Sequence, residues 1–138
     1  MKPIQEVYPD AFRENSYSYG ASSYGPMIES MAEEVLVRKR IGSYQGDELA
    51  LLKDNNRYGI LIFGFGSCTV CDSLLSCNSY EEVNDLRQRL YNNIKWRPSK
   101  EAIIDYLEEK NWDNEYIYHV NNNSVEDFLE ECKEVLGG

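Results

Sequence analysis

The 138-residue sequence is poor in the residues and motifs that enzymatic chemistry most often requires. It contains one histidine, His119, so neither a histidine pair for a metal nor a serine–histidine catalytic set can be recognised. No phosphate loop and no Gly-x-Gly-x-x-Gly motif occurs, because "GFGSC" at residues 64–68 breaks that pattern after its second glycine. We therefore expect a protein that is not an enzyme, with thiol–disulfide exchange as the one enzymatic alternative.

Long apolar runs are also missing. None reaches the roughly 18 residues of a membrane span, and the start "MKPIQEVYPD" lacks the charged-then-apolar order of a signal peptide. We therefore predict a cytoplasmic protein with no membrane partner. Thiols stay reduced in a cytoplasm, which argues against disulfides among the four cysteines.

Basic residues are scarce relative to acidic ones, and the net charge is −10. Nearly all of the excess lies in residues 99–138, which contain eleven acidic and three basic side chains. Such a field repels nucleic-acid phosphates and attracts basic surfaces, so we expect no direct nucleic-acid binding and predict a protein partner with a basic nucleic-acid-binding groove. The predicted partner-binding residues are Glu101, Asp105, Glu108, Glu109, Asp113, Glu126, Asp127, Glu130, Glu131 and Glu134.

The apolar periodicity predicts an α+β fold, an antiparallel β-meander of about three to four strands with three or four helices packed on one face. Residues 1–26 read as a Tyr/Ser/Gly-rich N-terminal arm, and residues 27–138 as a single domain. The predicted strands cover 34–42, 46–54, 57–65 and 115–120, with a turn at Asp54, Asn55 and Asn56. The predicted helices begin near Pro26, at Ser79, at Ser99 and at Ser124.

Three of the four cysteines, Cys68, Cys71 and Cys77, lie within ten positions, and three interpretations of them stay open. A Cys-x-x-Cys turn with Cys77 as third ligand could bind zinc, the fourth ligand being His119, Cys132 or a partner residue. The order strand, Cys-x-x-Cys, helix resembles that of thioredoxin-like proteins over "ILIFGFGSCTVC" alone, although Asp72 beside Cys71 disfavours a thiolate. Small buried thiols in a tight turn are the third interpretation. We predict that the protein has no cofactor. Zinc is the alternative to that prediction.

Residues 42–90 combine a "GSYQGD" turn, an "RYG" strand and a "GSC-x-x-CD-x-L" loop that leads into a helix. This run resembles a group of small proteins of phages and other mobile elements, whose function is largely unassigned. The resemblance rests on Gly42, Gly46, Asp47, Tyr58, Gly59, Gly66, Ser67, Cys68, Cys71 and Asp72. It implies a mobile-element origin and, for a phage protein, the cytoplasm of the host cell.

This origin and the acidic C-terminal third together suggest an anti-CRISPR-like inhibitor. In this hypothesis the protein occupies a basic nucleic-acid-binding surface of a host defence nuclease, with a CRISPR effector as a candidate partner. The alternative is a zinc-stabilised or Cys-x-x-Cys redox accessory protein. A third hypothesis is a self-associating structural protein whose Tyr-rich arm reaches a neighbouring copy.

Overall fold

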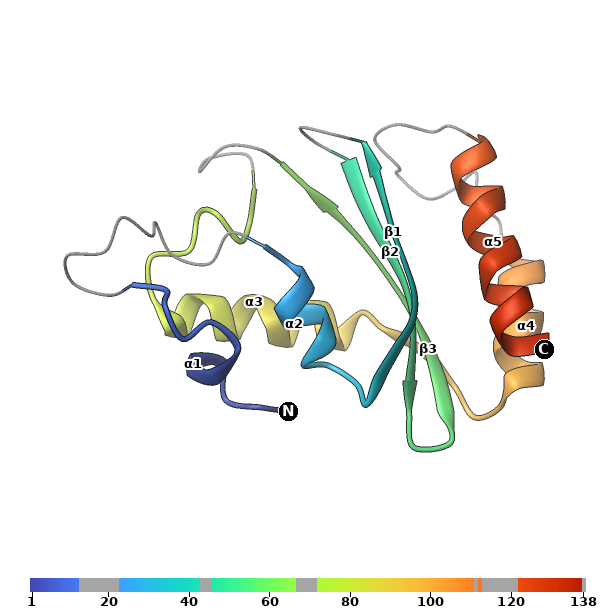
Figure 1. The fold of residues 1–138 in the computed structure, drawn as a ribbon, viewed down its shortest axis with the longest axis horizontal. Coiled ribbons are helices and arrows are strands. Elements are labelled where there is room, and N and C mark those ends of the chain that lie inside the picture. The colour runs from blue at the N-terminus through green and yellow to red at the C-terminus, as the bar shows by residue number, and fades with distance from the viewer. Residues whose placement is uncertain (13–22, 43–45, 67–71, 111, 113–121, 138) are drawn as a thin grey trace.

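The chain folds around a four-stranded antiparallel sheet with helices on both of its faces (Figure 1). The structure is a computed structural model, and it describes residues 1–12, 23–42, 46–66, 72–110, 112 and 122–137. In chain order the elements are α1 (Ile4–Val7), α2 (Gly25–Glu29), β1 (Glu34–Gly42), β2 (Gly46–Asp54), β3 (Arg57–Phe65), α3 (Tyr80–Asn92), β4 (Lys95–Arg97), α4 (Lys100–Glu109) and α5 (Asn122–Gly137). The predicted α+β fold is confirmed.

The order of the strands in the sheet is their order in the chain. β1, β2 and β3 form the predicted meander, and β4 pairs with the far side of β3. The β2–β3 hairpin pairs Asp54 with Arg57, and Asn55 in its turn has the left-handed φ of 57° that asparagine tolerates. β4 was not predicted: the sequence suggests only a helix end at Trp96, whereas this residue pairs with Gly59 of β3.

The sheet divides the interior into two cores. On one face Ala50 and Leu52 pack with α1, α2 and α3, and we call this the first core. On the other face Leu49 and Leu51 pack with α4 and α5, in the second core. The structure thus differs from the prediction in having helices on both faces. The sequence signal is the unbroken apolar run 49–52, because a strand buried on both faces does not alternate.

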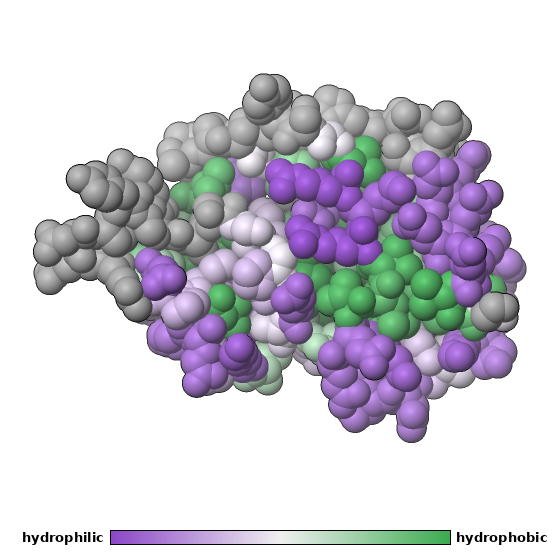
Figure 2. Space-filling model, viewed as in Figure 1, coloured by the Kyte–Doolittle hydropathy of each residue, from purple (hydrophilic) through white to green (hydrophobic). Residues whose placement is uncertain are grey.

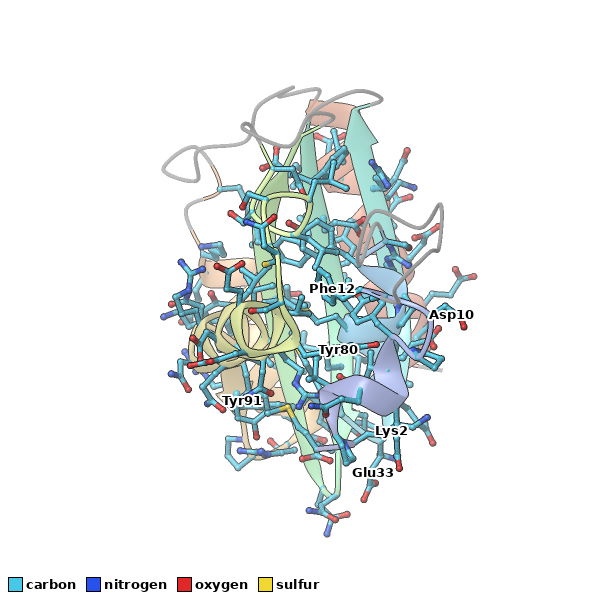
Figure 3. All side chains as sticks on the ribbon, turned by 90° about the vertical axis from the view of Figure 1, so that its left-hand side faces the viewer. Lys2, Asp10, Phe12, Glu33, Tyr80 and Tyr91 are labelled. Atoms are coloured by element: carbon cyan, nitrogen blue, oxygen red, sulfur yellow. The ribbon has the colours of Figure 1, made fainter. Side chains whose placement is uncertain are left out.

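The first twelve residues, which we predict as part of the N-terminal arm, pack against α3 in the first core. Phe12 and Tyr80 lie beside each other in Figure 3, with their ring centroids 5.2 Å apart in an edge-on arrangement. The buried Arg87 of α3 donates a hydrogen bond of 2.6 Å to the carbonyl of Lys2. Residues 13–22 of the predicted arm lie outside the described residues.

α3 and α4 begin at the predicted caps, whereas α5 begins at Asn122, two residues before the predicted start at Ser124. The Ser79 hydroxyl accepts a hydrogen bond of 3.2 Å from the backbone N–H of Glu82, and the Ser99 hydroxyl accepts one of 3.1 Å from that of Ala102. Both contacts satisfy N–H groups that have no partner within the helix. The strand predicted over 115–120 lies outside the described residues.

Candidate functional site

The carboxylate of Asp72 joins the two ends of the segment that contains Cys68 and Cys71. Its oxygens accept hydrogen bonds from the backbone N–H of Gly66 at 2.8 Å, on the incoming side, and from the N–H groups of Leu74 and Leu75 at 3.0 Å each, on the outgoing side. We call this set of contacts, together with Tyr24, the Asp72 network. Residues 67–71 themselves lie outside the described part of the chain.

Tyr24 completes the Asp72 network from the other end of the sequence. Its hydroxyl is 3.2 Å from both carboxylate oxygens of Asp72 and accepts a hydrogen bond of 3.1 Å from the N–H of Leu74. Burial and the neighbouring carboxylate raise the pKa of Tyr24 above its usual range, so the phenol stays protonated and donates. All of these partners are internal, so we interpret Asp72 as a structural residue.

Two glycines of the "GSYQGD" and "RYG" stretches allow close packing. A Cβ atom at Gly46 would lie 1.8 Å from the carbonyl oxygen of Ile41, across the β1–β2 connection. One at Gly59 would lie 2.6 Å from Ile94 and 2.7 Å from Trp96, where β4 pairs with β3. At both positions a side chain would collide with a neighbouring segment of the chain, so glycine allows the close packing of the strands there.

Cys77 and Cys132 are separated by the sheet. Cys77 lies in the first core and its thiol donates a hydrogen bond of 3.3 Å to the carbonyl of Ser73, whereas Cys132 is fully buried in the second core. The interpretation in which Cys77 and Cys132 ligate one zinc ion is therefore wrong. No group of three His, Cys, Asp or Glu residues that could hold a metal ion occurs among the described residues. Cys68, Cys71 and His119 lie outside them.

Burial keeps both described thiols protonated. It raises the pKa of Cys77, and it raises the pKa of Cys132 to about 12 and that of Tyr8 to about 12. The unfolded chain releases the Cys132 and Tyr8 protons at lower pH than the folded chain does. The stability that these groups contribute is therefore complete below about pH 8 and is lost as the pH rises from there toward 12.

We therefore expect the free energy of unfolding in urea to fall by about 1 kcal/mol between pH 8 and pH 10 through Cys132 alone. Cys132→Val keeps an apolar side chain in the second core and has no titrating group, so its decline over this interval should be smaller by that amount. Equal declines for the two proteins would show that the Cys132 thiol ionises normally in the folded state.

The exposed carboxylates of α4 and α5 form what we call the anionic face. Its members are Glu101, Asp105, Glu108, Glu109, Glu126, Asp127, Glu130, Glu131 and Glu134, and all nine side chains are exposed. α4 and α5 lie side by side over the second core (Figure 1), and an ion pair of 3.6 Å between Glu108 and Lys133 joins them. Asp113, the tenth predicted partner-binding residue, lies outside the described residues.

Helical geometry gathers the α4 acids on one side. Glu101, Asp105 and Glu109 follow one another at intervals of four residues, so with Glu108 they cover an arc of about 100°. The opposite side of α4 buries Ile103 and Leu107 in the second core. The acidic side therefore points to solvent.

α5 repeats this arrangement. Its five acids are two adjacent pairs, Glu126 with Asp127 and Glu130 with Glu131, followed by Glu134, and they cover an arc of about 140°. The second core receives the other side of the helix: Val125, Phe128, Cys132 and Leu136 are buried. The helical repeat predicts a buried stripe of six residues, Val125, Phe128, Leu129, Cys132, Val135 and Leu136. It is confirmed at the four buried positions, Leu129 is half-buried, and the prediction is wrong at Val135, which is 46% exposed.

Two lysines neutralise part of the anionic face. Lys133 pairs with Glu108, and Lys39 of β1 pairs with Glu131 at 3.8 Å. The other seven members make no ion pair with a described residue: Glu101, Asp105, Glu109, Glu126, Asp127, Glu130 and Glu134. Most of the negative charge on this face is thus uncompensated within the described part of the chain.

A cavity of about 360 Å³ borders the acidic side of α4, next to β4. It is lined by Arg97, Ala102, Asp105, Tyr106, Glu109 and Lys110. The guanidinium of Arg97 stacks 4.6 Å from the ring centroid of Tyr106. This cavity could not be predicted from the sequence, because Arg97 belongs to the unpredicted strand β4. Two carboxylates and two cations line it, at the border of the anionic face.

No described helix has both the length and the apolar composition of a membrane span. Comparison with known protein families, with curated proteins and with solved structures finds no match. The resemblance of residues 42–90 to small phage proteins therefore stays a prediction.

Proposed function

We propose that this chain is a non-enzymatic binding protein whose anionic face occupies a basic nucleic-acid-binding surface of another protein. The observation on which the proposal depends is the density of uncompensated carboxylates on α4 and α5. The partner class that the sequence analysis predicts, a host defence nuclease such as a CRISPR effector, is part of the proposal.

The charge density of the anionic face matches that of nucleic acid. Four carboxylates over Glu101–Glu109, an interval of about 12 Å along the helix, amount to one charge per about 3 Å. The five carboxylates over Glu126–Glu134 span the same length. Once the charges of Lys39 and Lys133 are subtracted, the two helices together keep seven negative charges over about 24 Å, or one per about 3.4 Å. One strand of duplex DNA has one phosphate per about 3.4 Å, so the two helices present the charge of about three to four base pairs.

The acids are placed where they lower the stability of the helices that contain them. Five pairs of like charge stand four residues apart, at 101/105, 105/109, 126/130, 127/131 and 130/134. Each such pair costs about 0.2–0.5 kcal/mol. Glu108 and Glu109 also occupy the last turn of α4, where the helix dipole disfavours negative charge. A surface that served only solubility would mix both signs, so these costs favour a binding role.

The test compares two variants of equal net charge. The face variant combines Asp105→Asn, Glu109→Gln, Glu130→Gln and Glu134→Gln, which make no ion pair with a described residue. The control variant combines Glu6→Gln, Glu29→Gln, Glu81→Gln and Asp85→Asn, four exposed acids on the side of the sheet with the first core. Both remove four negative charges and leave the two cores unchanged.

We expect the wild-type protein to bind at least one member of a panel of purified CRISPR effectors and other defence nucleases and to displace its labelled nucleic acid. The face variant should bind about 30-fold more weakly, since each lost carboxylate removes a fraction of a kilocalorie per mole of attraction, while the control should stay within about twofold. Equal losses in the two variants would show that only net charge matters. Absence of binding across the panel would end the proposal.

A further inference from the structure

One edge of the sheet is long, and no strand of the described part of the chain lies beside it. β1 is the end strand of the sheet, it has nine residues and no proline, and within the described residues it pairs only with β2. Every second residue of such a strand directs its N–H and C=O groups away from the sheet. The opposite edge is different: β4 has three residues and is followed by Pro98, a protected edge.

The side chains of β1 toward α2 are basic. Arg38 forms a two-pronged ion pair with the buried Glu48 of β2, at 2.9 and 3.0 Å. Arg40, two residues further along the same side, lies 3.8 Å over the ring of Phe65 and makes no ion pair with a described residue. Arg40 therefore presents an exposed, uncompensated positive charge at the edge of the sheet.

The side of β1 toward α5 is mostly apolar: Val37 and Ile41 are buried in the second core, and Lys39 between them is paired with α5. Leu36 is half-buried against the second core, and Val135 of α5 is 46% exposed. In Figure 2 an apolar surface lies between β1 and α5, below the strongly hydrophilic surface over the upper part of β1. The α5 carboxylate that reaches β1, Glu131, is paired with Lys39. An added strand would thus meet a cation on one side and apolar atoms on the other.

We propose that the outer edge of β1 binds an extended acidic segment of another protein as a fifth strand. The side chains of this segment that face Arg38 and Arg40 are acidic, and the alternate ones, which lie toward Val37, Ile41 and Val135, are apolar. Backbone hydrogen bonds supply the affinity and the alternating side chains the specificity. This binding site is separate from the anionic face and independent of the proposed function.

The same features oppose pairing with a second copy of this chain in the register centred on the basic run. Antiparallel pairing of two β1 strands about Lys39 would place Arg38 of each copy opposite Arg40 of the other, and like charges directly opposite are destabilising. Leu36 is an extra residue in β1, because the register shifts between Val35 and Val37. Such a bulge confines further pairing to residues 37–42. An acidic segment meets neither like charge nor bulge there.

The probes are fluorescent eight-residue peptides measured by anisotropy against the full chain. The first alternates aspartate and valine, the second has the same composition with the four aspartates and the four valines in separate blocks, and the third is the first with alternate backbone nitrogens methylated. We expect the alternating peptide to bind at least tenfold more tightly than the other two. Hydrogen exchange should slow at the β1 amides when it is bound.

Protein variants locate the site. Arg40→Glu should weaken binding of the alternating peptide at least tenfold, with Arg40→Gln as the milder substitution if the first variant folds poorly. Lys95→Glu makes the same change of charge on exposed β4 and should leave binding unchanged. Equal binding of the three peptides, or equal effects of the Arg40 and Lys95 variants, would overturn the proposal. A wild-type dimer in sedimentation that dissociates on Arg40→Glu would assign the edge to a second copy instead.

Discussion

Asp72→Ala is expected to lower the free energy of unfolding by about 3 kcal/mol, and the melting temperature by about 10 °C. The substitution removes the acceptor for the N–H groups of Gly66, Leu74 and Leu75 and for the hydroxyl of Tyr24. The N–H of Leu74 still donates to the Tyr24 oxygen, whereas the N–H groups of Gly66 and Leu75 donate to no other described residue. Unsatisfied donors in a buried site cost about 1–3 kcal/mol each.

Two further substitutions make this measurement specific. Asp85→Ala removes an exposed carboxylate from α3 and should change the unfolding free energy by less than about 0.5 kcal/mol, which controls for the loss of one negative charge. Tyr24→Phe keeps the buried ring and removes the hydroxyl that donates to Asp72. We expect it to lower the free energy of unfolding by about 1 kcal/mol. An Asp72→Ala protein as stable as Asp85→Ala would refute the structural role that we assign to Asp72.

The sequence could predict what neighbouring residues determine. The turn at Asn55 follows from the tolerance of asparagine for positive φ, and the helix starts at Ser79 and Ser99 follow from side-chain caps within three residues. The buried stripe of α5, from Val125 to Leu136, follows from the helical repeat alone. Each of these features is encoded within one or two turns of chain.

What the sequence could not predict depends on contacts between distant residues. β4 is too short to show a period of its own, and it forms because Trp96 packs at Gly59 of β3. The Asp72 network joins Tyr24 to a carboxylate 48 positions away. The part of the network between Asp72 and Leu75 could be recognised in the sequence, since an aspartate commonly accepts hydrogen bonds from N–H groups two and three residues later, as Asp72 does here.

The candidate site, too, has one part that local sequence could predict and one part that depends on contacts between distant residues. That the acids of α4 and α5 are exposed could be inferred from the apolar stripes on the other sides of these helices. That the two acidic rows lie on one surface depends on the packing of α4 beside α5, which the ion pair between Glu108 and Lys133 records. The anionic face thus exists only while α5 is held on the second core.

Phe128 is the side chain on which this attachment depends most. It is fully buried in the second core, among the largest such side chains of the described chain. Phe128→Ala should lower the free energy of unfolding by about 4 kcal/mol, because it removes apolar contacts and leaves a cavity. Val135→Ala, at the exposed position of the same helix, should cost less than about 0.5 kcal/mol and serves as the matched control.

The Phe128 substitution also connects stability to the proposed function. In Phe128→Ala, amide hydrogen exchange should accelerate first in α5, since this helix contacts the sheet through β1 and its own apolar stripe, while β2 and β3 stay protected. Binding to a basic partner should weaken in step with the fraction of molecules in which α5 is detached, although all nine carboxylates are still present. If Phe128→Ala opened α5 and left partner binding unchanged, the carboxylates would act without a fixed surface, and the helix pair would not be the binding unit.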